Sequence, residues 1–201
     1  MEARSPGGLT GEEPGEPVEI RRTVLVSGPP GAGKTTVARP LAKALGFALL
    51  SKDDIKEALY SPLGGKPGDV EFSRRVGAAA MEVLWALAPR CPRVVLEANF
   101  RTKSDYERGK VRELGGDVVE VFCRIPLDEA SRRFAERARE ERHHPAHALQ
   151  ELTEEQLMNY AEPFGLGPVI DLDTTRPVDV GELARLIRDA WRDPEDGGSP
   201  I

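Results

Sequence analysis

A glycine-rich turn between two patterned segments limits this chain to few architectures. The turn reads Gly28-Pro-Pro-Gly-Ala-Gly-Lys-Thr-Thr36 and matches the pattern G-x-x-x-x-G-K-[ST] in full. The segment before it, Thr23-Val-Leu-Val-Ser27, is rich in β-branched residues and predicts a buried strand. Residues 34–45, after it, have the pattern of a helix. A strand that leads through such a turn into a helix is typical of an α/β domain.

We call Gly28–Thr36 the phosphate loop, because its composition suits phosphate binding. Glycines let backbone N–H groups curl around phosphate oxygens, and the helix N-terminus adds its positive dipole. Lys34 is expected to reach the β- and γ-phosphates, and the Thr35 hydroxyl to ligate Mg²⁺. The residues predicted to bind the nucleotide here are Gly28, Pro29, Pro30, Gly31, Ala32, Gly33, Lys34, Thr35 and Thr36.

The rest of the chain alternates between strand-like and helix-like segments. Strands are predicted at about residues 23–27, 47–51, 93–97, 117–123 and 168–172. Helices are predicted at about 34–45, from 53 onward, at 69–88, 104–114, 127–142 and 178–191. This alternation predicts a three-layer α/β domain with a parallel sheet. Ligands of such sheets bind at the carboxyl ends of the strands, so polar residues at those ends are candidates for the site.

Composition sets the outer limits of the domain. Residues 1–20 and 193–201 are rich in Pro, Gly and acidic residues, which predicts a disordered leader and a flexible tail around a single domain at 21–192. No run of 18 apolar residues and no apolar leader segment occurs, so we expect neither a membrane span nor a signal peptide. The two cysteines, Cys91 and Cys123, have no metal-like spacing and indicate buried thiols in a reducing cytoplasm.

The net charge is acidic. A formal charge of −6 argues against a protein that coats nucleic acid electrostatically, although it leaves room for a local basic groove. Nucleic acid is therefore a possible partner that the charge does not favour.

Two acidic residues and a lysine follow the second predicted strand. Asp53 is expected at the same sheet edge as the phosphate loop, where its carboxylate could accept a proton from an attacking hydroxyl or help to hold Mg²⁺. The alternative is that Asp53 only caps the next helix, and Asp54 suits the first turn of that helix. Lys56 lies one turn further on, where it could face an anionic substrate or solvent.

The third predicted strand ends in Glu97, and Asn99 and Arg101 follow it. Glu97 could orient water around Mg²⁺, and Asn99 and Arg101 are candidates for contact with the substrate. The alternative reads Glu97 as a solvated charge at a strand end and Asn99 as a turn residue.

An arginine-rich helix is predicted after the fourth strand. Arg133 and Arg137 are four residues apart and share a face, and guanidinium groups stabilise the charge that develops in phosphoryl transfer. A helix of this kind could also close over the phosphates and exclude water. The alternative is a solvated face with internal ion pairs, such as Arg132 with Glu136.

All three histidines, His143, His144 and His147, lie together around Pro145. No cysteine or fourth ligand is close in sequence, which argues against zinc. A role in substrate contact or as a hinge, or none beyond exposed loop positions, stays open.

These motifs together resemble a known family. The phosphate loop, Lys52-Asp53-Asp54, Leu-Glu97-Ala-Asn99 and Arg133-x-x-x-Arg137 are similar to the P-loop kinases grouped with phage polynucleotide kinase, zeta toxins, chloramphenicol phosphotransferase and gluconate kinase, over about residues 22–190. The resemblance implies an ATP-dependent phosphotransferase with Mg²⁺, the strand order 2-3-1-4-5 and a helical lid at about 125–150.

The resemblance also implies roles for individual residues. Asp53 would be the base toward the acceptor hydroxyl, Lys56 would contact the substrate, and the lid arginines would touch the ATP phosphates. The adenine would sit near the loop after the last strand, which contains Thr174. Lys56 stands where polynucleotide kinase has arginine, which weakens bidentate phosphate recognition, and Glu97 stands where several relatives have aspartate.

The expected function is transfer of the γ-phosphate of ATP·Mg to a hydroxyl acceptor. The catalytic set is Lys34, Asp53, Arg133 and Arg137, and the Mg²⁺ ligands are Thr35, Asp53 and Glu97, with Asp54 as a rival to Glu97. A basic groove would favour polynucleotides, whereas a closed pocket lined by the Trp85 helix and the 62–68 loop would favour a small molecule. Two alternatives stay open: a nucleotide-binding switch without an acceptor, and a toxin-like sugar-nucleotide kinase with an antitoxin.

Overall fold

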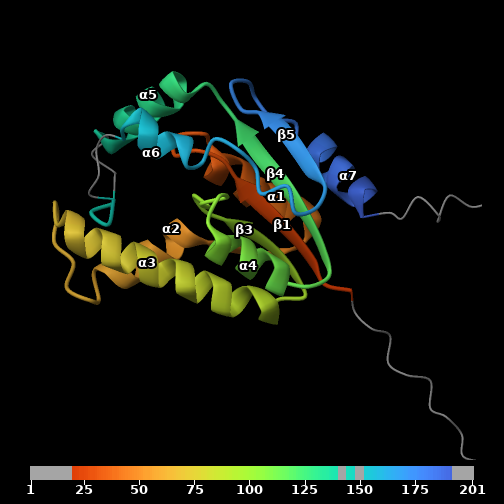
Figure 1. Ribbon diagram of the computed structural model, residues 1–201, viewed down its shortest axis with the longest axis horizontal. Helices are drawn as coiled ribbons and strands as arrows, with labels where there is room; N and C mark the ends of the chain where they lie inside the picture. Colours follow the sequence, from red (N-terminus) through yellow and green to blue (C-terminus); the bar gives the residue numbers. More distant parts are fainter. Residues whose placement is uncertain (1–19, 140–143, 148–151, 192–201) are drawn as a thin grey trace, which may run out of the picture.

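Five parallel strands form one sheet in the order β2-β3-β1-β4-β5, as the family resemblance implies (Figure 1). The computed structural model describes residues 20–139, 144–147 and 152–191, and the statements below concern these residues. The strands are β1 (Arg22–Ser27), β2 (Ala48–Ser51), β3 (Arg93–Glu97), β4 (Asp117–Arg124) and β5 (Val169–Asp173). All four pairings are parallel, so the carboxyl ends of the strands meet at one edge.

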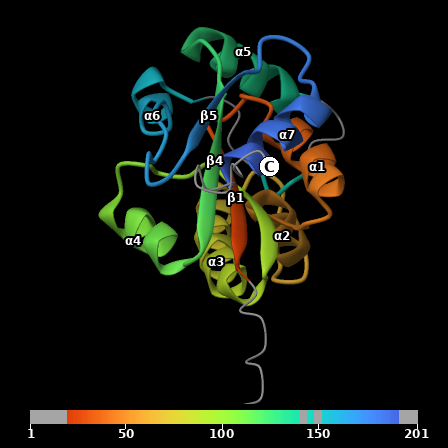
Figure 2. The same cartoon turned by 90° about the vertical axis from the view of Figure 1, so that its right-hand side faces the viewer.

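The helices cover both faces of the sheet (Figure 2). They are α1 (Lys34–Leu45), α2 (Lys52–Tyr60), α3 (Val70–Leu87), α4 (Asp105–Glu113), α5 (Leu127–Ala138), α6 (Glu154–Met158) and α7 (Val180–Ala190), with a short 3₁₀ turn η1 (Ala88–Arg90) after α3. Helices α1 and α7 pack on one face, and α3 and α4 on the other. The predicted three-layer α/β architecture is therefore confirmed.

The central strand β1 shows why this sequence needs two layers of helices. Val24 and Val26 belong to the core cluster with α1 and α7, whereas Leu25 belongs to the cluster with α3 and α4. Each of these side chains is at most 1% exposed. An unbroken apolar run is what a strand buried on both faces requires.

The observed boundaries differ from the predicted ones mainly around α5. This helix ends at Ala138, whereas the arginine-rich pattern predicted a helix to residue 142. Residues 140–143 lie outside the described part of the chain, as do residues 1–19, 192–201 and the predicted lid positions 148–150. Within the described residues, no helix combines the length and the apolar character needed to cross a membrane.

Candidate active site

The phosphate loop connects β1 to α1 and is packed so closely that it requires its glycines. Gly28, Gly31 and Gly33 have φ values of 130°, 86° and 75°. A Cβ on Gly31 would lie 2.1 Å from the carbonyl oxygen of Ala130 in α5, and one on Gly28 would lie 2.6 Å from that of Cys123 in β4. At Gly33 no side chain caps the first N–H groups of α1. Uncapped N–H groups at a helix start form an anion site, so the loop fits a phosphate ligand.

Lys34 adds a buried positive charge to this loop. Its side chain folds back, and Nζ donates to the carbonyl oxygens of Gly28 at 3.0 Å and Pro29 at 2.8 Å. The residue is 6% exposed, and burial lowers the pKa of its ammonium group. The carbonyls are neutral, and the charges of Glu97 and Asp53 only partly offset the effect of burial on this pKa, so a phosphate would be a favourable further partner.

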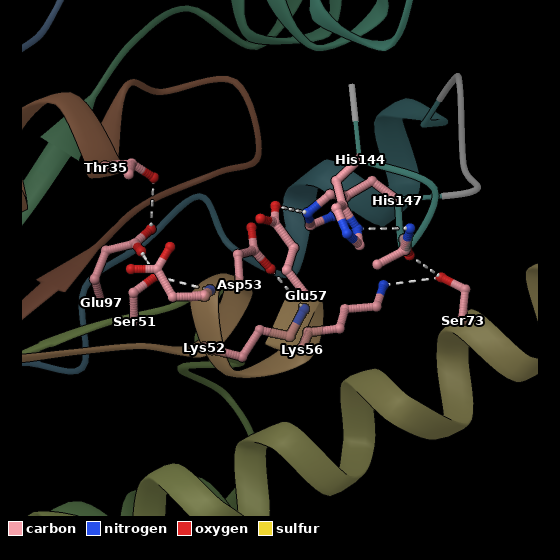
Figure 3. A network of polar contacts seen from close by, with 12 residues as sticks. Thr35, Ser51, Lys52, Asp53, Lys56, Glu57, Ser73, Glu97, His144 and His147 are labelled. Carbon is pink, nitrogen blue, oxygen red and sulfur yellow. Dashed lines mark hydrogen bonds and ion pairs between the residues drawn. The ribbon is translucent and has the colours of Figure 1, made fainter. Parts of the chain in front are cut away.

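Glu97 faces the phosphate loop across the sheet edge. Thr35 Oγ1 donates to Glu97 Oε1 at 3.3 Å, and Ser51 Oγ donates to Glu97 Oε2 at 2.6 Å (Figure 3). Parallel pairing of Ser51 with Glu97 holds the two residues side by side, and Glu97 is 3% exposed. It is therefore not a solvated charge at a strand end. The Thr35 hydroxyl and the Glu97 carboxylate supply oxygen donors of the kind that Mg²⁺ prefers.

Asp54 points elsewhere. Its Oδ1 accepts from Arg39 Nη2 of α1 at 2.7 Å, and its side chain is 48% exposed. Of the two rivals for the Mg²⁺ site, Glu97 is thus the one in contact with Thr35.

Asp53 lies between the Glu97 group and the far end of α2 (Figure 3). The N-cap of α2 is Ser51, so Asp53 is not needed as a cap. Burial alone would raise the pKa of Asp53, but the charge of Lys52, the charge of His147 and a 2.9 Å hydrogen bond from Lys52 Nζ lower it to about 2. The carboxylate is therefore ionised at neutral pH, and its side chain keeps 30% exposure.

Lys56 is a second buried cation, one turn after Asp53. Its Nζ donates to Ser73 Oγ of α3 at 2.8 Å, and the residue is 7% exposed. Burial, followed by the charge of Lys52, lowers the pKa of Lys56 to about 8. Among the described residues no carboxylate lies within ion-pair distance of it, so its charge is available to a ligand.

A cavity of about 800 Å³ is lined by Asp53 and Lys56, whereas Lys34, Thr35 and Glu97 are not among its lining residues. It brings together six predicted site residues, Pro30, Asp53, Lys56, Asn99, Arg101 and Arg137. Pro30 of the phosphate loop lines one side, and Trp85 and Tyr106 add aromatic surface. Sequence patterns alone did not single out the lining residues Lys52, Ser73, Arg74, Glu82 and Glu107. Ser73 could have been found, because it is a polar residue on the apolar face of a helix.

The 62–68 loop does not line this cavity, whereas the helix that carries Trp85 does. Tyr60 explains the difference, because its hydroxyl donates to the Lys66 carbonyl at 2.8 Å. A Cβ on Gly65 would lie 2.4 Å from the Tyr60 ring, which shows how closely the loop packs there. The loop is thus held at the far end of α2.

The arginines of α5 separate into three environments. Arg137 lines the cavity, and its charge helps to lower the pKa of Lys34. Arg133 is not among the cavity residues; its Nε donates to Glu129 at 2.8 Å, and its Nη1 donates to the Thr174 carbonyl at 3.1 Å. Arg132 pairs with Glu129 and Glu136 on the exposed face, as the solvated alternative expects.

Thr174 is buried after β5, where its hydroxyl donates to the Arg124 carbonyl at 3.0 Å. A smaller cavity of about 210 Å³ is lined by Pro29, Phe122, Arg124, Ile125, Pro126, Leu127 and Ala161. Pro29 lines the smaller cavity and Pro30 the larger one, so the phosphate loop stands between them. Thr174 itself does not line either cavity, and Thr36 is exposed in α1.

Two of the three histidines lie in the described residues, and His143 lies outside them. His147 lines the large cavity, whereas His144 does not. Among the described residues no group of three His, Cys, Asp or Glu side chains is placed to hold a metal, so His144 and His147 form no such site there.

Comparison with known proteins agrees with this geometry. Residues 24–163 match the family model described as "AAA domain". A solved structure from Chloroflexus aurantiacus, whose assignment as a kinase is itself provisional, is 26% identical with a TM-score of 0.73, covering 86% of this chain and all of that one. Cytidylate kinase of Ignicoccus hospitalis is 31% identical over 123 residues, 57% of this chain and 63% of its own length.

An uncharacterised protein of Mycobacterium tuberculosis is 30% identical over 129 residues, 58% of this chain but 26% of its own length. The chain thus spans less than two thirds of these curated relatives. The family match covers most of the chain and includes the phosphate loop, Glu97 and Asp53. This chain therefore belongs to the AAA domain family, within the group of P-loop kinases.

Proposed function

We propose that this protein transfers the γ-phosphoryl group of ATP to a hydroxyl group of a small, anionic acceptor. The observation that carries the proposal is the single cavity that joins the phosphate loop to Asp53 and Lys56. It offers a nucleotide site and an acceptor site in contact with each other, as transfer between two bound substrates requires.

On the nucleotide side, the chain supplies donors for phosphate oxygens. The uncapped N–H groups at the start of α1 and the Lys34 ammonium would bind the β- and γ-phosphates. Thr35 and Glu97 would hold Mg²⁺, which when bound would neutralise charge on the phosphates. Arg137 would stabilise the transferring group, and Arg133 would support α5 through Thr174. The smaller cavity beside Pro29 is a candidate for the base, and Thr174, whose hydroxyl donates to the carbonyl of the lining residue Arg124, stays a candidate for contact with it.

On the acceptor side, Asp53 would bind the attacking hydroxyl. A carboxylate with a pKa of about 2 is a weak base, so its main role would be to orient the hydroxyl by accepting its hydrogen bond. This is sufficient where the transition state of phosphoryl transfer is loose and needs little help from a base. Asn99 and Arg101 would contact the rest of the acceptor.

Charge and size support a small anion as the acceptor. A cavity of about 800 Å³ is in the range of small-ligand pockets. Five basic side chains line it against three carboxylates: Lys52, Lys56, Arg74, Arg101 and Arg137 against Asp53, Glu82 and Glu107. Lys56 has only a neutral partner, so a carboxylate or phosphate of the acceptor would supply its missing counter-charge.

The proposal is tested by production of ADP from ATP and Mg²⁺ with a panel of acceptors. The panel holds hydroxy acids, sugar phosphates, nucleoside monophosphates, neutral sugars and oligonucleotides with a 5′-hydroxyl. We expect one class of small anionic alcohols to stimulate turnover at least about tenfold over hydrolysis by water. Lys34→Met, which removes the phosphate-binding charge, is expected to abolish the stimulation.

Stimulation by oligonucleotides alone would replace the small acceptor by a polynucleotide. Nucleotide binding without stimulation by any acceptor would instead favour a nucleotide-binding switch.

A further inference from the structure

The short segment 144–147 packs against α2 and α3, although it lies between α5 and α6 in the sequence (Figure 3). Ala146 is fully buried and belongs to a cluster with Tyr60 of α2 and Val76 of α3. The rings of Tyr60 and His144 meet edge to face at 6.3 Å. Burial of this backbone requires that its polar groups find partners.

Ser73 supplies one of these partners and links the segment to Lys56. Its hydroxyl donates to the Ala146 carbonyl at 2.6 Å and accepts from Lys56 Nζ at 2.8 Å. The Ala146 N–H donates to His144 Nδ1 at 3.1 Å, which closes the turn. A single serine therefore holds both the segment and the buried lysine.

His147 is oriented by a second contact. Its Nε2 lies 2.8 Å from Glu57 Oε1 of α2, and the imidazole nitrogen donates because a carboxylate only accepts. The same side chain lines the cavity with Asp53 and Lys56. When protonated, its ring helps to lower the pKa of Asp53.

From these contacts we propose that His147 contacts the phosphoryl acceptor and determines which acceptors fit, and that Ser73 is a positioning residue that holds His147 in place through Ala146. This inference rests on the proposed function of the same cavity. Of the described residues of this segment, His147 lines the cavity together with Asp53, so its side chain also takes up space there that water would otherwise fill.

The first test compares His147→Ala and His147→Gln in steady-state kinetics with the acceptor found by the panel. We expect His147→Ala to raise the KM for the acceptor about tenfold or more, the loss of one good hydrogen bond, with the KM for ATP unchanged. His147→Gln keeps a donor for Glu57 and is expected to recover most of the affinity. Ser61→Ala, an exposed position at the end of α2 and outside the cavity, is the control and should leave both constants unchanged. Equal constants for wild type and His147→Ala would overturn the proposal.

The second test needs no acceptor. Ser73→Ala leaves the Ala146 carbonyl without its donor and Lys56 without its acceptor, so His147 is held less firmly and water gains access to the cavity. We expect hydrolysis of ATP to water to rise about threefold or more, with the KM for ATP unchanged. Ser73→Thr, which keeps the hydroxyl, should show a smaller rise than Ser73→Ala, and Ser61→Ala, an exposed serine at the end of α2, should behave as wild type.

The two tests separate the inference from the proposed function. A panel without any acceptor would contradict the proposed function, whereas the hydrolysis rates of the Ser73 variants would still decide the inference. No rise in hydrolysis in Ser73→Ala would overturn it. A rise shared by Ser61→Ala would overturn it as well, because the effect would then not come from the segment.

Discussion

Lys56 shows how one residue can combine a cost in stability with a role in binding. Its side chain is buried, its only hydrogen-bond acceptor among the described residues is Ser73, and its pKa falls to about 8. Below that pH the charge is present and attracts an anion; above it the charge is lost. Packing alone does not explain a buried lysine without an ion-pair partner, because burial of an apolar side chain at this position would cost less free energy.

The pH dependence of acceptor binding follows from this pKa. We expect kcat/KM for the acceptor, which reports groups of the free enzyme, to fall as the pH rises through about 8. Lys56→Arg keeps its positive charge at these pH values, so its kcat/KM for the acceptor is not expected to fall as the pH rises through about 8. Burial lowers the pKa of Lys34 as well. Lys34 is the same in wild type and in Lys56→Arg, so comparing the two pH profiles removes its contribution. An identical decline in Lys56→Arg would contradict the account.

Glu97 leads to a prediction about Mg²⁺. Its carboxylate contacts the Thr35 hydroxyl, and Glu97→Gln keeps its size while removing its charge. We expect the Mg²⁺ concentration for half-maximal rate to rise about 10- to 100-fold, the range seen when groups that support a metal are lost. Titration of Mg²⁺ at fixed ATP measures it, with Asp54→Asn as the control that should behave as wild type. An unchanged Mg²⁺ requirement in Glu97→Gln would remove Glu97 from the metal site.

At the residue scale, the sequence predicted which residues lie near the carboxyl edge of the sheet better than it predicted their hydrogen-bond partners. Asp53, Lys56, Glu97, Asn99 and Arg101 could be found because each lies at or just after the carboxyl end of a strand. Their partners could not be found in this way. Ser73 and Ala146 are 73 residues apart in sequence, and no local pattern connects them.

At the element scale, α5 separates an arginine that lines the cavity from arginines that face solvent. Arg137 faces the cavity, whereas Arg132 is paired with Glu129 and Glu136 on the exposed side of the same helix. We expect Arg137→Ala to lower kcat about 100-fold, the usual loss when one donor to developing charge is removed. Arg132→Ala loses only exposed ion pairs, which contribute little, and is its matched control. Equal effects of the two substitutions on kcat would show that α5 acts only through its structure.

Elements were predictable where their pattern was local. The alternation of β-branched and amphipathic segments predicted the strands and most helices within a few residues. The strand order came from the family resemblance, because local patterns say nothing about which strands pair. The position of the 62–68 loop could not be predicted, because Tyr60 holds it by a contact that the glycines and prolines of the loop do not reveal.

At the scale of the whole molecule, the net charge of the chain and the charge of its main cavity differ in sign. The chain carries −6, yet the lining of its main cavity has more basic than acidic side chains. An acidic exterior with a basic cavity is consistent with a small anion as ligand, because binding depends on the local potential.

Nucleotide binding should also stabilise the whole domain. At a concentration about 100 times the Kd, a ligand adds about 2.7 kcal/mol to the free energy of unfolding. For a domain of this size that corresponds to a rise in Tm of about 5–10 °C. Thermal unfolding with Mg²⁺ and ADP measures it, and Lys34→Met should show a much smaller rise. The absence of any shift in the wild-type protein would contradict the nucleotide site.

The most direct test of the account is a single-turnover measurement with γ-labelled ATP, Mg²⁺ and the acceptor. Two neighbouring aspartates supply the test residue and its matched control. Asp53 lines the cavity, whereas Asp54 pairs with Arg39 outside it. We predict that label appears on the acceptor at the rate at which ADP forms in wild type and in Asp54→Asn. In Asp53→Asn the transfer should slow about 100-fold or more while ATP still binds. Transfer at the wild-type rate in Asp53→Asn, or label released only as free phosphate, would contradict the central claim.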